Sequence, residues 1–162
     1  MSEPRSLRRY LRSWIPTAIW LGVIFFLSTS IFSDEHTASV LAHVVAWLHL
    51  PLTARQVLIL NHRIRKLAHI SEYAVLSIFA FRSLQQGEGR WRLRSAVGAV
   101  LLCAAVAVCD EGFQAFMPDR GGLELRDVIL DTSGAILAQL AVWGWRRIWP
   151  GPHLTTLAGE AD

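Results

Sequence analysis

Three short stretches of this 162-residue chain place ionisable side chains inside otherwise apolar sequence. In the first stretch, Lys66, His69, Glu72 and Tyr73 follow one another at intervals of three, three and one residues, so Tyr73 is also four residues from His69. Side chains three and four apart share a helix face, and at 1.5 Å per residue this stripe is about 10 Å long. An imidazole near a carboxylate suits acid–base chemistry, and a lysine or imidazolium suits an anionic ligand. The stretch therefore predicts a polar helix face with a chemical role.

The second and third stretches add acids, an amide and an arginine. The second contains the following residues: Asp110, Glu111, Gln114 and Arg120. Pro118 and Gly121 in its last part indicate that the chain turns there. In the third stretch, Asp127, Asp131 and Gly134 share one helix face. Gly134 would let another helix approach closely, so this face is predicted to lie against a neighbour.

The elements that position these stretches are apolar runs. Apolar residues make up 52% of the chain, more than the roughly 45–50% of soluble domains. Four runs come near the ~20 residues that a membrane helix needs: 15–32, 67–81, 96–116 and 128–149. We expect an all-α, integral membrane four-helix bundle over 15–149. The first run also resembles a signal peptide, although the later runs favour an uncleaved span.

Loop charge predicts the orientation. Arginines gather in the basic segment 1–14, between the second and third runs, and after the fourth run. Such clusters mark the cytoplasmic side of a membrane. We therefore expect a multi-pass protein of the bacterial inner membrane with both termini in the cytoplasm. Four basic residues in the first external segment oppose this assignment: Arg55, Arg63, Arg65 and Lys66. The acidic segment between the third and fourth runs supports it.

Antiparallel spans would bring the three polar stretches to one depth, at the external interface. A charge at mid-bilayer costs about 2.5–3.5 kcal/mol on insertion scales. The many charges of these stretches are therefore expected near the membrane surface. Glu72 and Asp131 lie deepest, and we predict that each faces the bundle and is paired or protonated. The available partners are Lys66, His69 and Arg120.

The first external segment is too long to be a bare loop. Apolar residues in 39–50 have the spacing of an amphipathic helix, which Pro51 would end. Thr53 can cap a second short helix over 54–61 that runs into the second span. These helices are expected to lie on the outer membrane surface or to cover the bundle as a lid. The tail 150–162 is expected to be flexible, and Cys103 and Cys109 to be packing residues without a disulfide.

The order of the motifs resembles the VanZ-like family, bacterial membrane proteins named for a teicoplanin-resistance factor. The resemblance covers about 15–147 and is carried by these residues: Arg65-Lys66-Leu67-Ala68-His69-Ile70, Glu72-Tyr73, Leu76, Asp110-Glu111, Gln114, Phe116, Pro118, Arg120, Asp127-Val128 and Gly134. It implies four spans with the motifs on one side. Asp131 and Asp119 depart from the family pattern, which usually has asparagine and glycine there. The first departure adds a carboxylate to the cluster.

Three readings of the cluster remain open. It could hold the bundle together by interhelical hydrogen bonds. It could bind an anionic lipid or the phosphate of a lipid-linked wall precursor, and this reading is favoured; the binding residues would be Lys66, His69, Glu72, Tyr73, Asp110, Glu111, Gln114, Arg120, Asp127 and Asp131. It could catalyse hydrolysis or transfer on a lipid phosphate or ester, with His69 as base or nucleophile and Glu72 or Asp110 orienting it.

Other classes of protein are disfavoured. The net charge is +3, but no basic face interleaved with aromatic residues appears, so we expect no nucleic-acid partner. No Gly-x-Ser-x-Gly or His-Glu-x-x-His motif is present, and we expect no cofactor and no bound metal. Four spans without an internal repeat give little wall for a transport pathway. Membrane lipids are the expected partners.

Overall fold

The computed structural model describes residues 4–85, 91–116 and 124–149, and these are helical throughout apart from short connections. The elements in chain order are α1 (Pro4–Leu27), the short 3-10 helix η1 (Ser30–Phe32), α2 (Asp34–Trp47), α3 (Ala54–Gln85), α4 (Leu93–Ala115) and α5 (Leu125–Ile148). The all-α prediction is confirmed. The tail 150–162, predicted to be flexible, lies outside the described residues.

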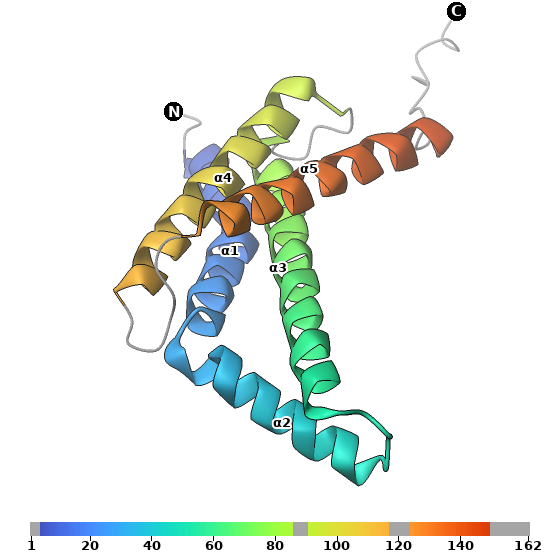
Figure 1. The fold of residues 1–162 in the computed structure, drawn as a ribbon. Coiled ribbons are helices and arrows are strands. Elements are labelled where there is room, and N and C mark those ends of the chain that lie inside the picture. The colour runs from blue at the N-terminus through green and yellow to red at the C-terminus, as the bar shows by residue number, and fades with distance from the viewer. Residues whose placement is uncertain (1–3, 86–90, 117–123, 150–162) are drawn as a thin grey trace, which may run out of the picture.

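Helix α3 is the centre of the fold. It contacts α1, α2, α4 and α5, and in Figure 1 it runs through the middle of the molecule while α5 crosses it. Tyr73 and Leu76 of α3 are fully buried, together with Ile24 of α1, Cys103 of α4 and Ala135 of α5. Small side chains on α4 and α5 let the helices approach closely. The core is therefore built around the middle of α3.

Three helices among the described residues are long and apolar enough to cross a membrane. They are the part of α1 over Tyr10–Leu27, α4 over Leu93–Ala115 and α5 over Leu125–Ile148. The chain is thus a multi-pass membrane protein with three candidate spans. The fourth expected span, 67–81, lies inside α3 and does not meet this description. Four other helices contact α3, so protein rather than lipid covers much of it, and its surface need not be as apolar.

The helix boundaries differ from the predicted runs at both ends of the first external segment. Helix α1 begins at Pro4, within the basic segment, and ends at Leu27 rather than at 32. Helix α2 begins at Asp34 instead of 39, because two acids in its first turn favour a helix N-terminus. It ends before Pro51 is reached: His49 adopts a positive φ of 52°, and the amide of Leu50 donates to the carbonyl of Val45 at 3.1 Å, the pattern of a Schellman cap.

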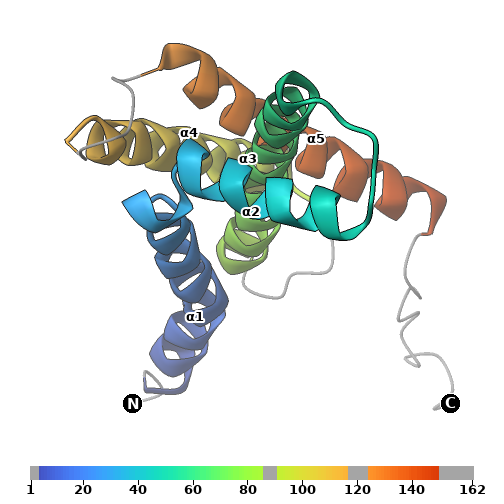
Figure 2. The ribbon, with the colours of Figure 1, turned by 60° about the horizontal axis from the view of Figure 1, so that its bottom comes forward.

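The predicted short helix over 54–61 forms the first turns of α3. Thr53 and Gln56 make a reciprocal cap: the amide of Thr53 donates to Oε1 of Gln56 at 2.8 Å, and the amide of Gln56 donates to Oγ1 of Thr53 at 3.4 Å. Val57 of α3 and Val45 of α2 are both 7% exposed where the two helices meet. Trp47, on the outer side of α2, is 78% exposed. Helix α2 therefore packs on α3 with one side and leaves an apolar side uncovered, as Figure 2 shows it lying across α3.

Cys103 and Cys109 are both free. Cys103 is buried in the core, and its thiol lies 3.9 Å from the carbonyl of Tyr73. Cys109 is exposed. The prediction of packing cysteines is therefore right for Cys103 and wrong for Cys109, because α4 turns that side of its apolar surface away from the other helices.

Candidate functional site

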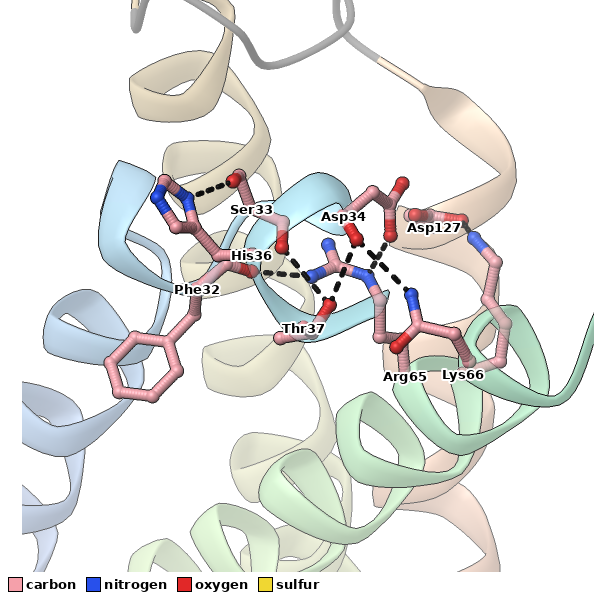
Figure 3. Close-up of polar contacts among 9 residues, drawn as sticks. Phe32, Ser33, Asp34, His36, Thr37, Arg65, Lys66 and Asp127 are labelled. Atoms are coloured by element: carbon pink, nitrogen blue, oxygen red, sulfur yellow. Dashed lines mark hydrogen bonds and ion pairs between the residues drawn. The ribbon is translucent and has the colours of Figure 1, made fainter. Parts of the chain in front are cut away.

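An ion pair and a contact between an imidazole and a carboxylate join α3 to α5. The Nζ of Lys66 donates to Oδ1 of Asp127, as Figure 3 shows. Three residues further along α3, Nδ1 of His69 lies 3.4 Å from Oδ1 of Asp131. The spacing of three residues on α3 and four on α5 keeps both pairs on the facing sides of the two helices. The first and third polar stretches thus meet in the structure.

Close backbone contact between α3 and α5 holds these pairs in place. A Cβ atom at Gly134 would lie only 2.5 Å from the carbonyl oxygen of Ile70, so only glycine fits there. One turn further, Nε2 of Gln139 donates to the carbonyl and the hydroxyl of Ser77 at 3.1 and 2.8 Å. The hydroxyl of Ser77 in turn donates to the carbonyl of Ala135 at 3.1 Å. These contacts fix the register of the two helices.

The second polar stretch supplies buried acids from α4. Asp110 is 1% exposed and Glu111 is 4% exposed. The amide of Gln114 donates to Oδ2 of Asp110 at 2.8 Å. The Oε2 of Glu111 accepts the backbone N–H of Glu124 at 3.0 Å, just before α5 begins. Glu111 therefore ties the end of α4 to the start of α5.

The acids of the three helices act on one another. Asp110 and Asp131 both interact electrostatically with Glu72, and Glu111 interacts with Asp110, Asp127 and Asp131. We call this set the acidic cluster, which comprises Glu72, Asp110, Glu111, Asp127 and Asp131. It lies where the end of α4 meets the start of α5, beside the N-terminal half of α3. Glu72, Asp110 and Asp131, predicted to converge, lie within electrostatic range of one another, and Lys66 joins the set through Asp127.

Several buried polar atoms of the cluster have no hydrogen-bond partner among the described residues. They are both carboxylate oxygens of Asp131, Oδ1 of Asp110 and the hydroxyl of Tyr73. A buried polar atom left unsatisfied costs roughly 1–3 kcal/mol, so native proteins keep few of them without a reason. Arg120, predicted as a partner of these acids, lies outside the described residues, as does the turn at Pro118.

A cavity of about 200 Å³ opens on the other side of α3. Its lining comes from the end of α1, from η1, and from α2 and α3: Leu27, Ser28, Phe32, Thr37, Asn61, Ile64, Arg65, Ala68, His69 and Glu72. Trp20 steadies the neighbouring backbone, since its Nε1 donates to the carbonyl of Glu72 at 2.8 Å. His69 lies both on this cavity and beside Asp131. It therefore connects the cavity to the acidic cluster.

Arg65 forms the rim of this cavity. Its Nε lies 2.5 Å from Oδ1 of Asp34, and its Nη1 donates to the carbonyl of Phe32 at 2.5 Å. Figure 3 shows the guanidinium reaching from α3 to the start of α2. The amide of Asn61 also donates to the carbonyl of Asp34, at 3.3 Å. Arg65 and Asn61 thus anchor α2 over the cavity.

The prediction of a single polar stripe on α3 needs a correction. Lys66 pairs with Asp127 of α5, whereas Glu72 lines the cavity about a third of a turn around the helix. Residues three and four apart drift around a helix of 3.6 residues per turn, so a stripe that combines both spacings spreads over two faces. The cavity face also contains Arg65, a residue of the family motif that was not among the predicted binding residues. The spacing of Arg65, His69 and Glu72, four and three residues apart, indicates that these three side chains share a helix face.

The described residues include no group of three or more His, Cys, Asp or Glu side chains able to hold a metal ion. The cluster is instead a set of acids, an imidazole and an ammonium group held between helices. These groups can form ion pairs and hydrogen bonds.

These features define a class: a multi-pass α-helical membrane protein with a buried charged cluster at one end of its helices. The VanZ/LLP1 family pattern matches residues 13–146, and the chain belongs to that family. The match extends from α1 to α5 and confirms the resemblance predicted from the three motifs. Comparison with curated proteins and with solved structures finds no match. The function is therefore argued from the site itself.

Proposed function

We propose that this protein binds the polar part of an envelope lipid, either an anionic lipid or a lipid-linked cell-wall component, in the cavity beside α3. The observation that carries this proposal is the composition of the cavity. Its ionisable side chains are Arg65, His69 and Glu72. Asp110 and Asp131, at 1% and 0% exposure, are withdrawn behind the helices. The open side of the site is therefore far less acidic than the cluster behind it.

The cavity combines groups for both halves of an amphipathic ligand. An arginine fork suits a phosphate or carboxylate, and His69 keeps Nε2 as the ring nitrogen that Asp131 does not engage. Leu27, Phe32 and Ile64 supply an apolar wall. Ligand sites generally pair an apolar lining with a few placed polar groups. Asp34 neutralises part of the charge of Arg65, which favours moderate and reversible binding.

The location of the cavity follows from the proposed orientation. Arginine clusters on the cytoplasmic side put both termini in the cytoplasm of a bacterial inner membrane and the cavity at the external interface. An external lipid site that holds a wall precursor would change how that precursor meets a glycopeptide. We propose on this ground a contribution to teicoplanin tolerance.

A binding experiment tests the site directly. The protein in lipid nanodiscs is titrated with phosphatidylglycerol and with a polyprenyl phosphate, with phosphatidylcholine as reference, and its thermal stability is measured. Ala68→Trp fills the cavity, and Leu67→Trp adds the same side chain at a neighbouring position that is 62% exposed and does not line it. We expect stabilisation by the anionic lipids that Ala68→Trp abolishes and Leu67→Trp keeps. Equal responses of the two variants would refute the proposal.

A growth assay tests the role in tolerance. The wild-type chain and both tryptophan variants are produced in a susceptible bacterium, and the inhibitory concentration of teicoplanin is measured with equal amounts of protein in the membrane. The wild type and Leu67→Trp should raise that concentration, and Ala68→Trp should not. An equal rise in the inhibitory concentration for all three proteins would show that tolerance does not depend on the cavity.

One contact favours a second candidate, a hydrolase or transferase acting on a lipid phosphate or ester. Asp131 lies 3.4 Å from Nδ1 of His69, the arrangement in which an acid orients an imidazole that serves as general base. Product release from the same lipids, lost in His69→Gln while lipid binding persists, would establish the enzyme. Binding without any product supports the first proposal.

A further inference from the structure

The far end of α4 and α5 carries a second and larger hollow. A groove of about 390 Å³ runs between the first half of α4 and the last half of α5. Its lining is almost wholly apolar: Trp91, Leu93, Ala96, Val97, Val100, Leu101, Ile136, Gln139, Leu140 and Trp143. The volume falls within the roughly 300–1,000 Å³ of ligand sites. In a helix pair that crosses a membrane, such a groove faces hydrocarbon.

Three arginines neighbour residues that line one end of this groove. Arg92 and Arg94 flank Leu93, which lines it. The guanidinium of Arg147 lies 4.8 Å from the ring centroid of Trp143, another lining residue. The described ranges 91–109 and 132–149, which form this half of the two helices, contain no Asp or Glu. Among the residues of these two ranges, the charges at this end of the groove are therefore all positive, whereas the groove itself is apolar.

We propose that this groove is a binding site for an anionic phospholipid, whose acyl chain occupies the groove and whose phosphate lies among Arg92, Arg94 and Arg147. Basic pockets between membrane helices recognise anionic headgroups in this way. The apolar groove and its positive end form one continuous surface. A single amphipathic molecule with a negative head satisfies both parts.

This site is separate from the cavity beside α3. The groove is lined by the first turns of α4, and the acidic cluster begins at Asp110 near the end of that helix. Opposite ends of α4 thus carry opposite charge. The two sites share no lining residue. A lipid in the groove would brace α4 against α5, which also frame the acidic cluster.

The test uses the full chain purified in detergent and analysed by native mass spectrometry after addition of phosphatidylglycerol, phosphatidylcholine or glycerol 3-phosphate. Val97→Trp fills the groove at a position that is 48% exposed. Val108→Trp is the matched control on the same helix, outside the groove and 54% exposed. We expect one retained phosphatidylglycerol in the wild type and in Val108→Trp, and at least a ten-fold weaker adduct in Val97→Trp.

Charge variants give a second, independent readout. Arg94→Gln and Arg147→Gln should each weaken phosphatidylglycerol retention about five-fold, the factor expected for one basic residue at a membrane surface. Arg126→Gln, near the start of α5, should leave it unchanged. Equal retention of phosphatidylcholine, binding of glycerol 3-phosphate alone, or an unaltered adduct in Val97→Trp would each overturn the proposal.

Discussion

At the scale of single residues, one glycine and one acid determine how α5 meets α3. Gly134 lies where a Cβ atom would come within 2.5 Å of the Ile70 carbonyl. Asp131, one turn earlier on α5, is completely buried and lies beside His69. The close approach that Gly134 permits is what brings these two side chains together. Packing and charge at this contact therefore depend on each other.

Gly134→Ala should destabilise the protein. The added methyl group meets backbone rather than a flexible side chain, so α5 must move away from α3, and such overpacking costs about 1–3 kcal/mol. The control is Gly144→Ala on the same helix, where nothing lies within 4 Å of an added Cβ; it should be neutral or slightly stabilising. The midpoint of thermal unfolding in detergent measures both, and a Gly134→Ala variant as stable as Gly144→Ala would contradict the close contact.

The contact between His69 and Asp131 should show strong coupling. Removing one partner of a buried pair leaves the other uncompensated, at a cost of about 3–5 kcal/mol. We expect His69→Ala to be markedly less stable than wild type and the double variant with Asp131→Ala to recover part of that loss. Chemical unfolding of the wild type, both single variants and the double variant gives the interaction free energy. Additive effects would show that the two side chains do not interact.

At the scale of the elements, α3 has a different chemical task on each side. Towards α5 it presents Lys66, His69 and Ser77, and towards α1 and α2 it presents Arg65 and Glu72. Neighbouring helices cover both sides, so the polar groups of α3 are tolerated because they face protein rather than lipid. This explains why α3 is the least apolar of the long helices and still lies at the centre.

Polar contacts between α3 and α5 should contribute measurably to stability. Gln139→Leu removes two hydrogen bonds to Ser77, and interhelical hydrogen bonds in membrane proteins are worth about 0.6 kcal/mol on average, with a maximum of about 1.7. We expect a loss in that range in thermal unfolding. Ser133→Ala is the control, since its hydroxyl bonds only to Leu130 of its own helix, at 2.6 Å. A larger loss of stability in Ser133→Ala than in Gln139→Leu would show that the hydrogen bonds between Gln139 and Ser77 do not stabilise the contact between α3 and α5.

Much of this arrangement could be predicted from residue spacing, and the exceptions have physical causes. Spacings of three and four correctly placed Lys66 with His69, and Asp127 with Asp131, on shared helix faces, and the structure adds that these two faces meet. Periodicity does not tell which neighbour a helix face meets, so the cavity face of Arg65 and Glu72 was missed. The span predicted over 67–81 is less apolar than the three candidate spans, because neighbouring helices cover much of α3 and its surface need not suit lipid. The sequence correctly indicated the cap at Thr53, which fixes the start of α3, and the run of 54–61 into the second span.

At the scale of the whole molecule, charge separates the two ends of the helices. The acidic cluster lies at one end, and Arg92, Arg94, Arg146 and Arg147 lie at the other. The basic residues that opposed the predicted orientation are partly neutralised by ion pairs: Arg65 lies beside Asp34 and Lys66 beside Asp127. Paired charges cross a membrane more cheaply than free ones. The opposing signal at the start of α3 is thus weaker than its count of charges suggests.

Cysteine labelling tests the resulting orientation. In a Cys103→Ala, Cys109→Ala background, a membrane-impermeant maleimide added to whole cells or spheroplasts should label Glu35→Cys, in the exposed first turn of α2. It should reach Arg94→Cys only after the membrane is opened, because arginine clusters stay in the cytoplasm. Labelling in the reverse order would turn the cavity beside α3 towards the cytoplasm. Binding of anionic lipids there could persist, but access to an external wall component and the proposed effect on teicoplanin would both be lost, since that part of the proposal depends on orientation alone.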